Sequence, residues 1–335
     1  MKTCVVGAGA IGGLVAARLA AQGHEVSVVV RGPHLAAIRA RGLTLREVDG
    51  TEHAFQLRAT DRMTELGQQD LVVIGLKAHQ VGGVAAEIRG LCGPATTVVT
   101  AQNGIPWWYF FKVGGSHQGT VLESVDPGGV VAKNIDVDRV LGSIVYPAAE
   151  IAAPGIVRHV EGDRISLGEV DNSDSERLRG TAKLLRDAGF KVRISTDLRS
   201  EIWVKLWGNC TFNPISALTQ ATLVDICQFP PTRALAERMM REAEAIGEKL
   251  GVRFPVSLEK RIAGAEAVGK HKTSMLQDVE TGRPLELGAL VGSVLELGRI
   301  TGVPTPNLTA VHACTALLAR TLREENGRLR IEPLG

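Results

Sequence analysis

A lysine and two asparagines recur at four-residue intervals within one apolar stretch of the chain. Lys205, Asn209 and Asn213 stand there among tryptophan, leucine, isoleucine, cysteine and phenylalanine residues. Positions four apart lie on one face of an α-helix, which turns once in about 3.6 residues. Buried amines and amides cost free energy unless polar partners meet them, and these partners can be internal groups, water or a ligand. Residues 201–213 therefore predict a helix whose polar stripe can bind a polar molecule.

This stripe could serve the reduction of a ketone, which needs a hydride at the carbonyl carbon and a proton at the carbonyl oxygen. A lysine in apolar surroundings can polarise the carbonyl and deliver that proton. Lys205 is therefore the candidate proton donor, and Asn209 and Asn213 can orient the substrate. Another interpretation stays open: Glu201 forms an i, i+4 ion pair with Lys205, and the asparagines join loops to the core.

A second motif follows the first apolar run of the chain. It consists of Gly7, Ala8, Gly9, Ala10, Ile11 and Gly12. In a strand-turn-helix unit, Gly7 permits the tight turn, Gly9 lets the backbone approach a pyrophosphate, and Gly12 lets helix and strand pack closely. The N–H groups at the helix start favour an anion. The motif predicts a dinucleotide site, and an ordinary glycine-rich turn is the alternative.

The residue after the second apolar run bears on the choice between NAD and NADP. NAD enzymes usually place Asp or Glu about 20 residues beyond the glycines, where it binds the ribose 2′-hydroxyl. Here Arg31 follows the valines 28–30, and a guanidinium can bind a 2′-phosphate with two hydrogen bonds. We therefore predict NADPH (NADP+) as the cofactor, with Lys77 as a second cation near its phosphates. A solvated arginine at a strand end is the alternative.

Strand and helix patterns alternate around these motifs up to about residue 195. Short apolar runs bounded by turn residues predict strands, and 3.6-residue periodicity predicts helices. The predicted strands are 2–6, 25–30, 71–75 and 97–101, and the predicted helices are 10–22, 33–41 and one after Lys77. We expect three later strands to extend this parallel sheet in the antiparallel direction: 139–146, 155–160 and 164–167.

Only helical patterns remain beyond about residue 197. They cover residues 198–218, 231–250, 286–301 and 306–325. This change in composition predicts a domain boundary between residues 195 and 196. The chain is therefore expected to be an α/β protein with an N-terminal Rossmann-like, doubly wound NADP-binding domain at 1–195 and an all-α substrate and catalytic domain at 196–330.

Charge and cysteine content limit the partners of the chain. Its 335 residues carry 38 basic and 36 acidic side chains, and the net charge of +2 offers no general attraction for nucleic acid or an anionic membrane. We find no signal peptide and no apolar run long enough for a membrane span. The five cysteines form no CxxC pair, and His79 and His271 stand alone, so no metal site is predicted. We expect a cytoplasmic protein that could form a homodimer through apolar helix faces.

Taken together and in order, these motifs resemble the ketopantoate reductase (2-dehydropantoate 2-reductase) family along nearly the whole chain. The matching segments are GAGAIGG at 7–13, Arg31, LKAHQ at 76–80, QNG at 102–104, KLWGNCTFNPISALT at 205–219 and SMLQDVETGRPLE at 274–286. The resemblance implies that Lys205 is the proton donor and that Asn209 and Asn213 bind the substrate.

The resemblance also assigns roles that spacing cannot. It implies that Asn103 contacts both cofactor and substrate, that Ser274 binds the substrate carboxylate, and that Glu286 lies beside the cofactor and the lysine. Without the resemblance, the segment around Ser274 would be interpreted as a surface loop leading into a helix.

Departures from the family pattern concern the substrate. Residues 270–273 and 219–222 lack asparagines that family members often carry. Trp107, Trp108 and Tyr109 follow the QN motif although only 4% of the chain is aromatic. They either pack a short helix into the core or line a pocket for a bulkier keto acid.

The resemblance implies an NADP-dependent oxidoreductase that acts on a CH–OH group and reduces 2-dehydropantoate to pantoate in pantothenate and coenzyme A biosynthesis. An NADPH-dependent reductase of another, bulkier 2-keto acid is the first alternative, and a non-catalytic NADP(H)-sensing protein is the second. The intact stripe that contains Lys205 argues against the sensor, because a binding module needs no buried proton donor.

Overall fold

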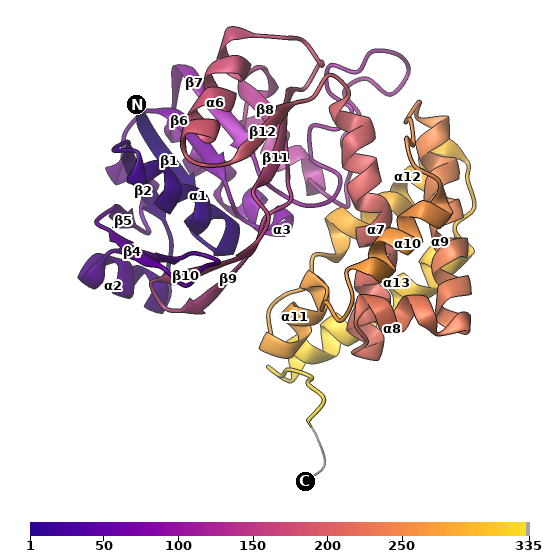
Figure 1. Ribbon diagram of the computed structural model, residues 1–335. Coiled ribbons are helices and arrows are strands. Elements are labelled where there is room, and N and C mark those ends of the chain that lie inside the picture. The colour runs from indigo at the N-terminus through magenta and orange to yellow at the C-terminus, as the bar shows by residue number, and fades with distance from the viewer. Residues whose placement is uncertain (333–335) are drawn as a thin grey trace. The chain divides into compact units, whose positions relative to one another are not determined.

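The chain divides after Leu198 into one unit of residues 1–198 and a second from residue 199 onward. The computed structural model describes residues 1–332, and Figure 1 labels their helices and strands where there is room. The division falls at the start of helix α7, Leu198–Thr219, a few residues beyond the boundary predicted at 195 and 196.

The first unit is built on an eight-stranded sheet in the order β12-β11-β8-β7-β6-β1-β2-β5. The pairings from β5 through β8 are parallel, and β11 pairs antiparallel with β8 and parallel with β12. The strands are β1 Lys2–Val6, β2 Glu25–Val29, β5 Arg58–Thr60, β6 Gln69–Ile74, β7 Cys92–Thr100, β8 Val140–Val145, β11 Arg164–Glu169 and β12 Lys191–Ile194. Because the strand order reverses on either side of β1, this is the doubly wound, Rossmann-like sheet that the sequence predicts, and such sheets bind dinucleotides at that reversal.

A smaller sheet, in the order β4-β3-β10-β9, packs against helix α1. Its strands are β3 Leu43–Arg46, β4 Glu52–Phe55, β9 Ala148–Ala153 and β10 Ile156–Glu161. The prediction that residues 155–160 extend the main sheet is therefore wrong, since β10 pairs with β3 and β9. The antiparallel direction predicted for 139–146 is also wrong, since β8 pairs in parallel with β7. The direction predicted for 164–167 is confirmed by the antiparallel pairing of β11 with β8.

The helices of the first unit cover the main sheet (Figure 1). They are α1 Ala10–Ala21, α2 Gly32–Arg41, α3 Ala78–Val81, α4 Ala85–Gly90, α5 Val130–Asn134 and α6 Glu176–Asp187. Apolar side chains of α1 and α6, among them Leu14 and Leu185, share one buried cluster with Val73 of β6 and Val99 of β7. This core holds the start of α1 against the carboxyl end of β1.

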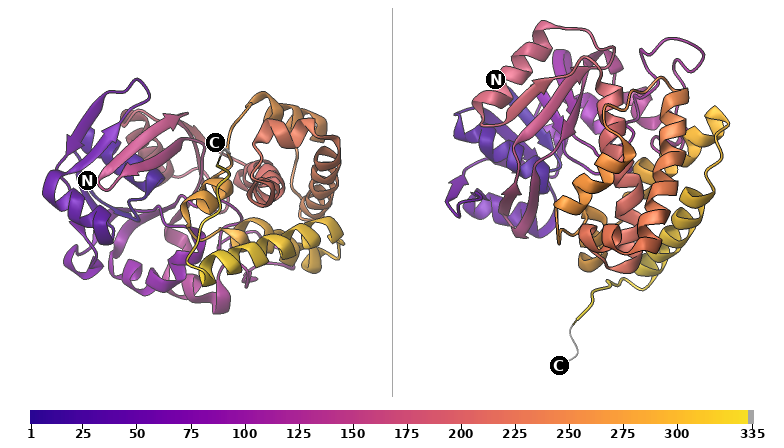
Figure 2. Two further views of the ribbon diagram at one scale, coloured as in Figure 1. Left: turned by 90° about the horizontal axis from the view of Figure 1, so that it is seen from below. Right: turned by 45° about the vertical axis from the view of Figure 1, so that its right-hand side comes forward.

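Every regular element described between residues 199 and 332 is helical, so the all-α prediction for this part of the chain is confirmed. After α7 come α8 Leu223–Gln228, α9 Pro230–Lys249, α10 Leu258–Ala267, α11 Ser274–Thr281, α12 Ser293–Thr301 and α13 Pro306–Glu324. The left view of Figure 2 looks nearly along α7, with other helices of the unit around it. None of the helices within residues 1–332 is long and apolar enough to cross a membrane.

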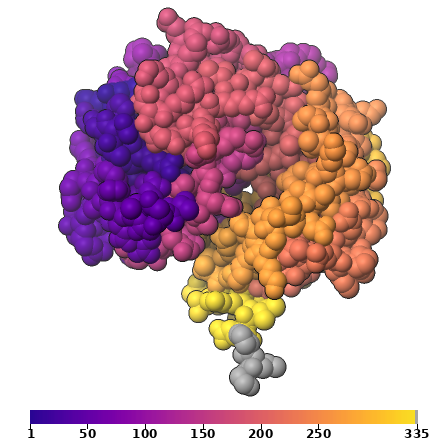
Figure 3. Space-filling view, in the orientation of Figure 1, coloured from indigo at the N-terminus to yellow at the C-terminus, as the bar shows by residue number. Residues whose placement is uncertain are grey.

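The end of the described chain returns to α11. Leu329 donates its N–H to the carbonyl oxygen of Val279 at 3.2 Å. In the space-filling view the yellow C-terminal residues lie next to the orange residues of this region (Figure 3). The helix predicted to start at Glu286 begins one residue later, and its first turn is a π-helix, Gly288–Gly292, that continues into α12.

Candidate active site

The glycine-rich segment forms the turn between β1 and α1. Gly7 has a φ of 93°, in the left-handed region that favours glycine, and its N–H donates to the carbonyl oxygen of Val29 at 2.9 Å. A Cβ on Gly12 would lie 2.1 Å from the carbonyl oxygen of Gly7. The fold of the first unit therefore requires glycine at both positions.

Gly9 is different, because no neighbouring atom of the protein excludes a side chain there. Its φ is −70°, and an added Cβ would meet nothing within 4 Å. This open space is where the motif would admit a pyrophosphate. Gly9 is also the N-cap of α1, which has no side-chain cap and no acidic residue in its first turn. The N–H groups of the first turn, Ala10, Ile11 and Gly12, can thus meet an anion, and the segment fits a dinucleotide.

A cavity of about 330 Å³ lies beside this turn. Gly7, Ala8, Gly9 and Arg31 line it, so the structure brings the glycine motif and the predicted phosphate-binding arginine together. Arg31 is exposed and forms the N-cap of α2. Leu76 and Gln80 of the LKAHQ segment also line the cavity, together with residues that no sequence motif marked, among them His34, Asp61, Met63, Val84, Glu87 and Ile151. Asp61 and Met63 follow β5, a strand of three residues that is too short for an apolar pattern to reveal.

Lys77 and Asn103 lie on neighbouring loops at the carboxyl edge of the main sheet. Lys77 is the N-cap of α3 after β6, and Asn103 follows the adjacent parallel strand β7. Nε2 of Gln102 joins the two loops, since it donates to the carbonyl oxygens of Ile74 at 2.7 Å and Leu76 at 3.3 Å. Neither Lys77 nor Asn103 lines the 330 Å³ cavity, so their contacts with a cofactor remain predictions.

His34, on α2, connects three segments of the first unit. Its Nε2 lies 3.0 Å from the carbonyl oxygen of Ala8 in the glycine-rich turn, and the N–H of Gly155 donates to its Nδ1 at 2.8 Å. Burial lowers the pKa of His34 below its ordinary value. The ring is thus neutral near pH 7 and bonded on both sides.

Helix α7 carries the predicted catalytic stripe. Trp203 and Trp207 on this helix are fully buried, and Nε1 of Trp207 donates to the carbonyl oxygen of Met240 at 2.7 Å. These anchors fix the rotation of α7 about its axis. Lys205 and Asn209 are half-buried as a result, and the stripe lies at the edge of the buried surface.

Cys210 is the thiol nearest the stripe in sequence. Burial raises its pKa to about 12, so the thiol stays protonated and offers no thiolate nucleophile. The chemistry of this helix therefore depends on the amine and the amides rather than on the sulfur.

Two predicted substrate-binding residues meet within the second unit. Nδ2 of Asn213, which is 5% exposed, donates to Oγ of exposed Ser274 at 3.5 Å. Ser274 is the first residue of α11, and the hydroxyl of its N-cap, Thr273, accepts the N–H of Leu276 at 3.2 Å. The alternative interpretation of this segment as a surface loop leading into a helix is therefore wrong for residues 274–281, although residues 283–286 do lead into the next helix without regular structure. Since Ser274 accepts from Asn213, its own hydroxyl proton can be donated to a carboxylate.

Glu286 is half-buried and lies one residue before the helix that begins at Leu287. The π-helical turn that follows, Gly288–Gly292, is of a type that occurs often at functional sites. The role of Glu286 beside cofactor and lysine remains a prediction.

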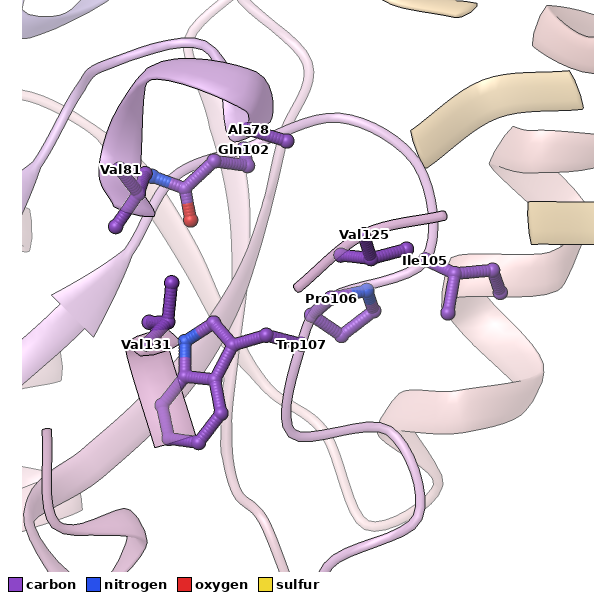
Figure 4. Close-up of a pocket in the computed structure, with 8 residues that line it drawn as sticks. All are labelled: Ala78, Val81, Gln102, Ile105, Pro106, Trp107, Val125 and Val131. Atoms are coloured by element: carbon purple, nitrogen blue, oxygen red, sulfur yellow. The ribbon is translucent and has the colours of Figure 1, made fainter. Parts of the chain in front are cut away.

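Trp107, Trp108 and Tyr109 are core residues, with 5%, 1% and 2% of their surface exposed. They lie in turns, so the short helix expected there is wrong. Nε1 of Trp108 donates to Oγ1 of Thr100 at 3.1 Å, and the Trp107 ring and Gln102 border a small cavity of about 10 Å³ (Figure 4). Their burial supports core packing and gives no reason to expect a bulkier substrate.

Comparison with known proteins gives consistent matches along the chain. The family model described as ketopantoate reductase PanE/ApbA matches residues 3–172, and the model of its C-terminal part matches residues 197–319. A 2-dehydropantoate 2-reductase of Mesorhizobium japonicum is 54% identical over 328 residues, which are 98% of this chain and 99% of that protein.

Solved structures share the whole fold. The crystal structure of a candidate ketopantoate reductase from Ralstonia solanacearum MolK2 has a TM-score of 0.92 and 42% identity, covering 96% of this chain and 98% of that one. A D-mandelate dehydrogenase bound to NADH and anilino(oxo)acetate has a TM-score of 0.81 over 96% of this chain and 100% of its own. At 20% identity, that second likeness concerns the fold alone.

Proposed function

Because the chain belongs to the ketopantoate reductase family, we propose that it reduces 2-dehydropantoate to pantoate with NADPH, as a step toward pantothenate and coenzyme A. It is an oxidoreductase that acts on a CH–OH group and depends on a nicotinamide cofactor. The observation that carries the proposal is the contact between Asn213 and Ser274, which joins two residues with assigned substrate roles in the unit that carries Lys205.

The proposed mechanism assigns each polar residue of the stripe a task. When bound, NADPH supplies the hydride that the ketone carbon requires. Lys205 donates a proton to the carbonyl oxygen as alkoxide charge develops on it. Asn209 and Asn213 orient the substrate oxygens from the same helix face, and the Ser274 hydroxyl donates to the substrate carboxylate.

The cofactor is assigned to the glycine-rich turn and the cavity beside it. The segment from Gly7 to Gly12 receives the pyrophosphate, and Arg31 binds the 2′-phosphate. Lys77 and Asn103 act from the two loops that Gln102 joins. Glu286 is assigned a place near the cofactor and the lysine.

The preference for NADPH depends on the charges that line this cavity. Asp61 and Glu87 line it together with Arg31, and carboxylates repel a phosphate. The cationic Arg31 must therefore outweigh them if NADPH is preferred over NADH.

A steady-state assay tests the proposal. NADPH oxidation is followed with 2-dehydropantoate and with a panel of branched and aromatic 2-keto acids. The highest kcat/KM is expected for 2-dehydropantoate, because Trp107, Trp108 and Tyr109 are buried and the cavity that Trp107 borders, about 10 Å³, is too small for a bulkier side chain. If a bulkier 2-keto acid gives a higher kcat/KM, the assignment of 2-dehydropantoate as the substrate is wrong. If the protein binds NADPH but turns over no keto acid, the result favours a non-catalytic NADP(H)-sensing protein.

Assembly and location belong to the same proposal. We expect a homodimer in the cytoplasm, and a dimeric ketopantoate reductase from Staphylococcus aureus shares this fold at 19% identity. Light scattering on the purified protein gives the mass of the assembly, and a monomeric mass at micromolar concentration would contradict the dimer.

A further inference from the structure

We propose that His34 is a positioning residue for the cofactor, holding the peptide unit between Ala8 and Gly9 in the orientation that dinucleotide binding requires. The inference rests on the proposed NADPH site and adds a residue outside the glycine motif. No step of the reaction is assigned to the histidine itself.

Hydrogen bonds to both ring nitrogens fix the state of the His34 ring. The N–H of Gly155 can only donate, so Nδ1, 2.8 Å away, carries no proton. The ring proton is therefore on Nε2, which donates to the carbonyl oxygen of Ala8 at 3.0 Å. A protonated ring would set a second N–H against that of Gly155, and burial opposes this state by lowering the pKa of His34.

The bond to Ala8 sets the direction of the next backbone donor. The peptide unit between Ala8 and Gly9 is planar and trans, so its C=O and N–H groups point in opposite directions. By holding the carbonyl oxygen of Ala8, His34 therefore fixes the direction of the Gly9 N–H. It also fixes the backbone just before the first turn of α1, whose N–H groups are assigned to the pyrophosphate.

The glycine-rich turn between β1 and α1 needs such a contact because Gly9 restrains the backbone little. The N–H groups of Gly7 and Ala8 donate to the carbonyl oxygen of Val29 at 2.9 and 3.4 Å. Both bonds precede the peptide unit between Ala8 and Gly9 in the chain and do not hold its carbonyl oxygen. At Gly9 there is no Cβ, and the space where one would stand is open to 4 Å. His34 supplies a side-chain anchor where the glycine supplies none.

His34 is itself braced by the small sheet. Gly155 lies in the turn between β9 and β10, with a φ of 84°, and a Cβ on it would lie 3.0 Å from Cβ of Ala37 in α2. The turn at Gly155 thus packs closely against α2, the helix that carries His34. Arg31 stands three residues before His34 at the start of the same helix, so the contact couples both predicted phosphate-binding segments.

Two conservative substitutions separate the contacts of the ring. The amide of asparagine reaches about as far as Nδ1 of histidine, and the amide of glutamine reaches about as far as Nε2. His34→Asn can therefore keep the bond to Gly155, and His34→Gln can keep the bond to Ala8. His34→Ala removes both bonds.

The experiment measures Kd for NADPH and for NADH by calorimetric titration of each folded variant, together with kcat at saturating NADPH. We expect His34→Ala and His34→Asn to raise Kd for both cofactors about three- to tenfold, the scale of one net hydrogen bond. We expect His34→Gln to bind within about twofold of the parent protein, and kcat to change less than about twofold in all three. Melting temperatures identify any variant that does not fold. If His34→Ala does not fold, the comparison of His34→Asn with His34→Gln tests the proposal.

The inference is overturned if His34→Asn binds like the parent while His34→Gln binds poorly, because the contact that matters would then be the one to Gly155. Unchanged Kd values in all three variants would overturn it as well. A parent protein that binds neither NADPH nor NADH would instead refute the proposed function, so the two failures are distinguishable.

Discussion

The Nδ2 atom of Asn213 lies 3.5 Å from Oγ of Ser274, although 61 residues separate the two in the sequence. The contact joins α7, which carries Lys205, to the N-terminal end of α11. The first turn of a helix has a partial positive charge, and the Ser274 hydroxyl keeps a proton to donate. An anionic carboxylate of a keto acid suits this arrangement.

Ser274→Ala removes that donor. We expect KM for the keto acid to rise about 10- to 100-fold, the range for hydrogen bonds to charged groups, with Kd for NADPH unchanged. Thr281→Ala at the other end of α11 is the matched control and should leave KM unchanged. Equal KM values in the Ser274 variant and the parent, measured by steady-state kinetics, would remove Ser274 from substrate binding.

Gly9→Ala and Gly12→Ala should separate cofactor binding from folding. A Cβ on Gly9 meets no protein atom, so this variant should melt like the parent but bind both NADPH and NADH at least about tenfold more weakly. A Cβ on Gly12 would lie 2.1 Å from the carbonyl oxygen of Gly7, so this variant should lose about 1–3 kcal/mol of stability. Thermal melting and dinucleotide titration check both, and an unimpaired Kd in Gly9→Ala would exclude the pyrophosphate from that space.

Arg31→Ala tests the choice of cofactor. Removing the guanidinium should weaken NADPH binding by about 1.5–3 kcal/mol and leave NADH binding nearly unchanged. Arg41→Ala, an exposed arginine at the other end of α2, is the control and should change neither affinity. Calorimetric titration gives both Kd values, and equal losses for the two cofactors would contradict a 2′-phosphate site at Arg31.

Lys205→Ala tests the proton donor. We expect kcat to fall about 10²- to 10⁴-fold, the scale of a lost general acid, while Kd for NADPH changes little. If Lys205 instead serves an ion pair with Glu201, then Lys205→Ala and Glu201→Ala should both lower the melting temperature and leave the folded enzyme active. Single-turnover oxidation of NADPH and thermal melting of both variants distinguish a proton donor from an ion-pair partner of Glu201. A folded Lys205→Ala protein with near-parent turnover would end the proposed mechanism.

The parts of the site that the sequence predicts are those that depend on neighbours in the chain. The glycine motif must follow a strand and open a helix, and Gly12 must approach Gly7, five residues away. Likewise, Lys205 and Asn209 share a face because the period of an α-helix places them there. Such local geometry holds wherever the segment lies in the fold, so the sequence determined both motifs and the change from α/β to all-α composition.

Other features depend on which segments meet in space, and only the tertiary structure decided them. The residues of β10 have strand character, but their pairing with β3 and β9 rather than with the main sheet is set by long-range hydrogen bonds. The bonds of His34 to Ala8 and Gly155 reach across 26 and 121 residues. No local pattern encodes such partners, because they follow from the packing of α2 and the small sheet around the glycine-rich turn.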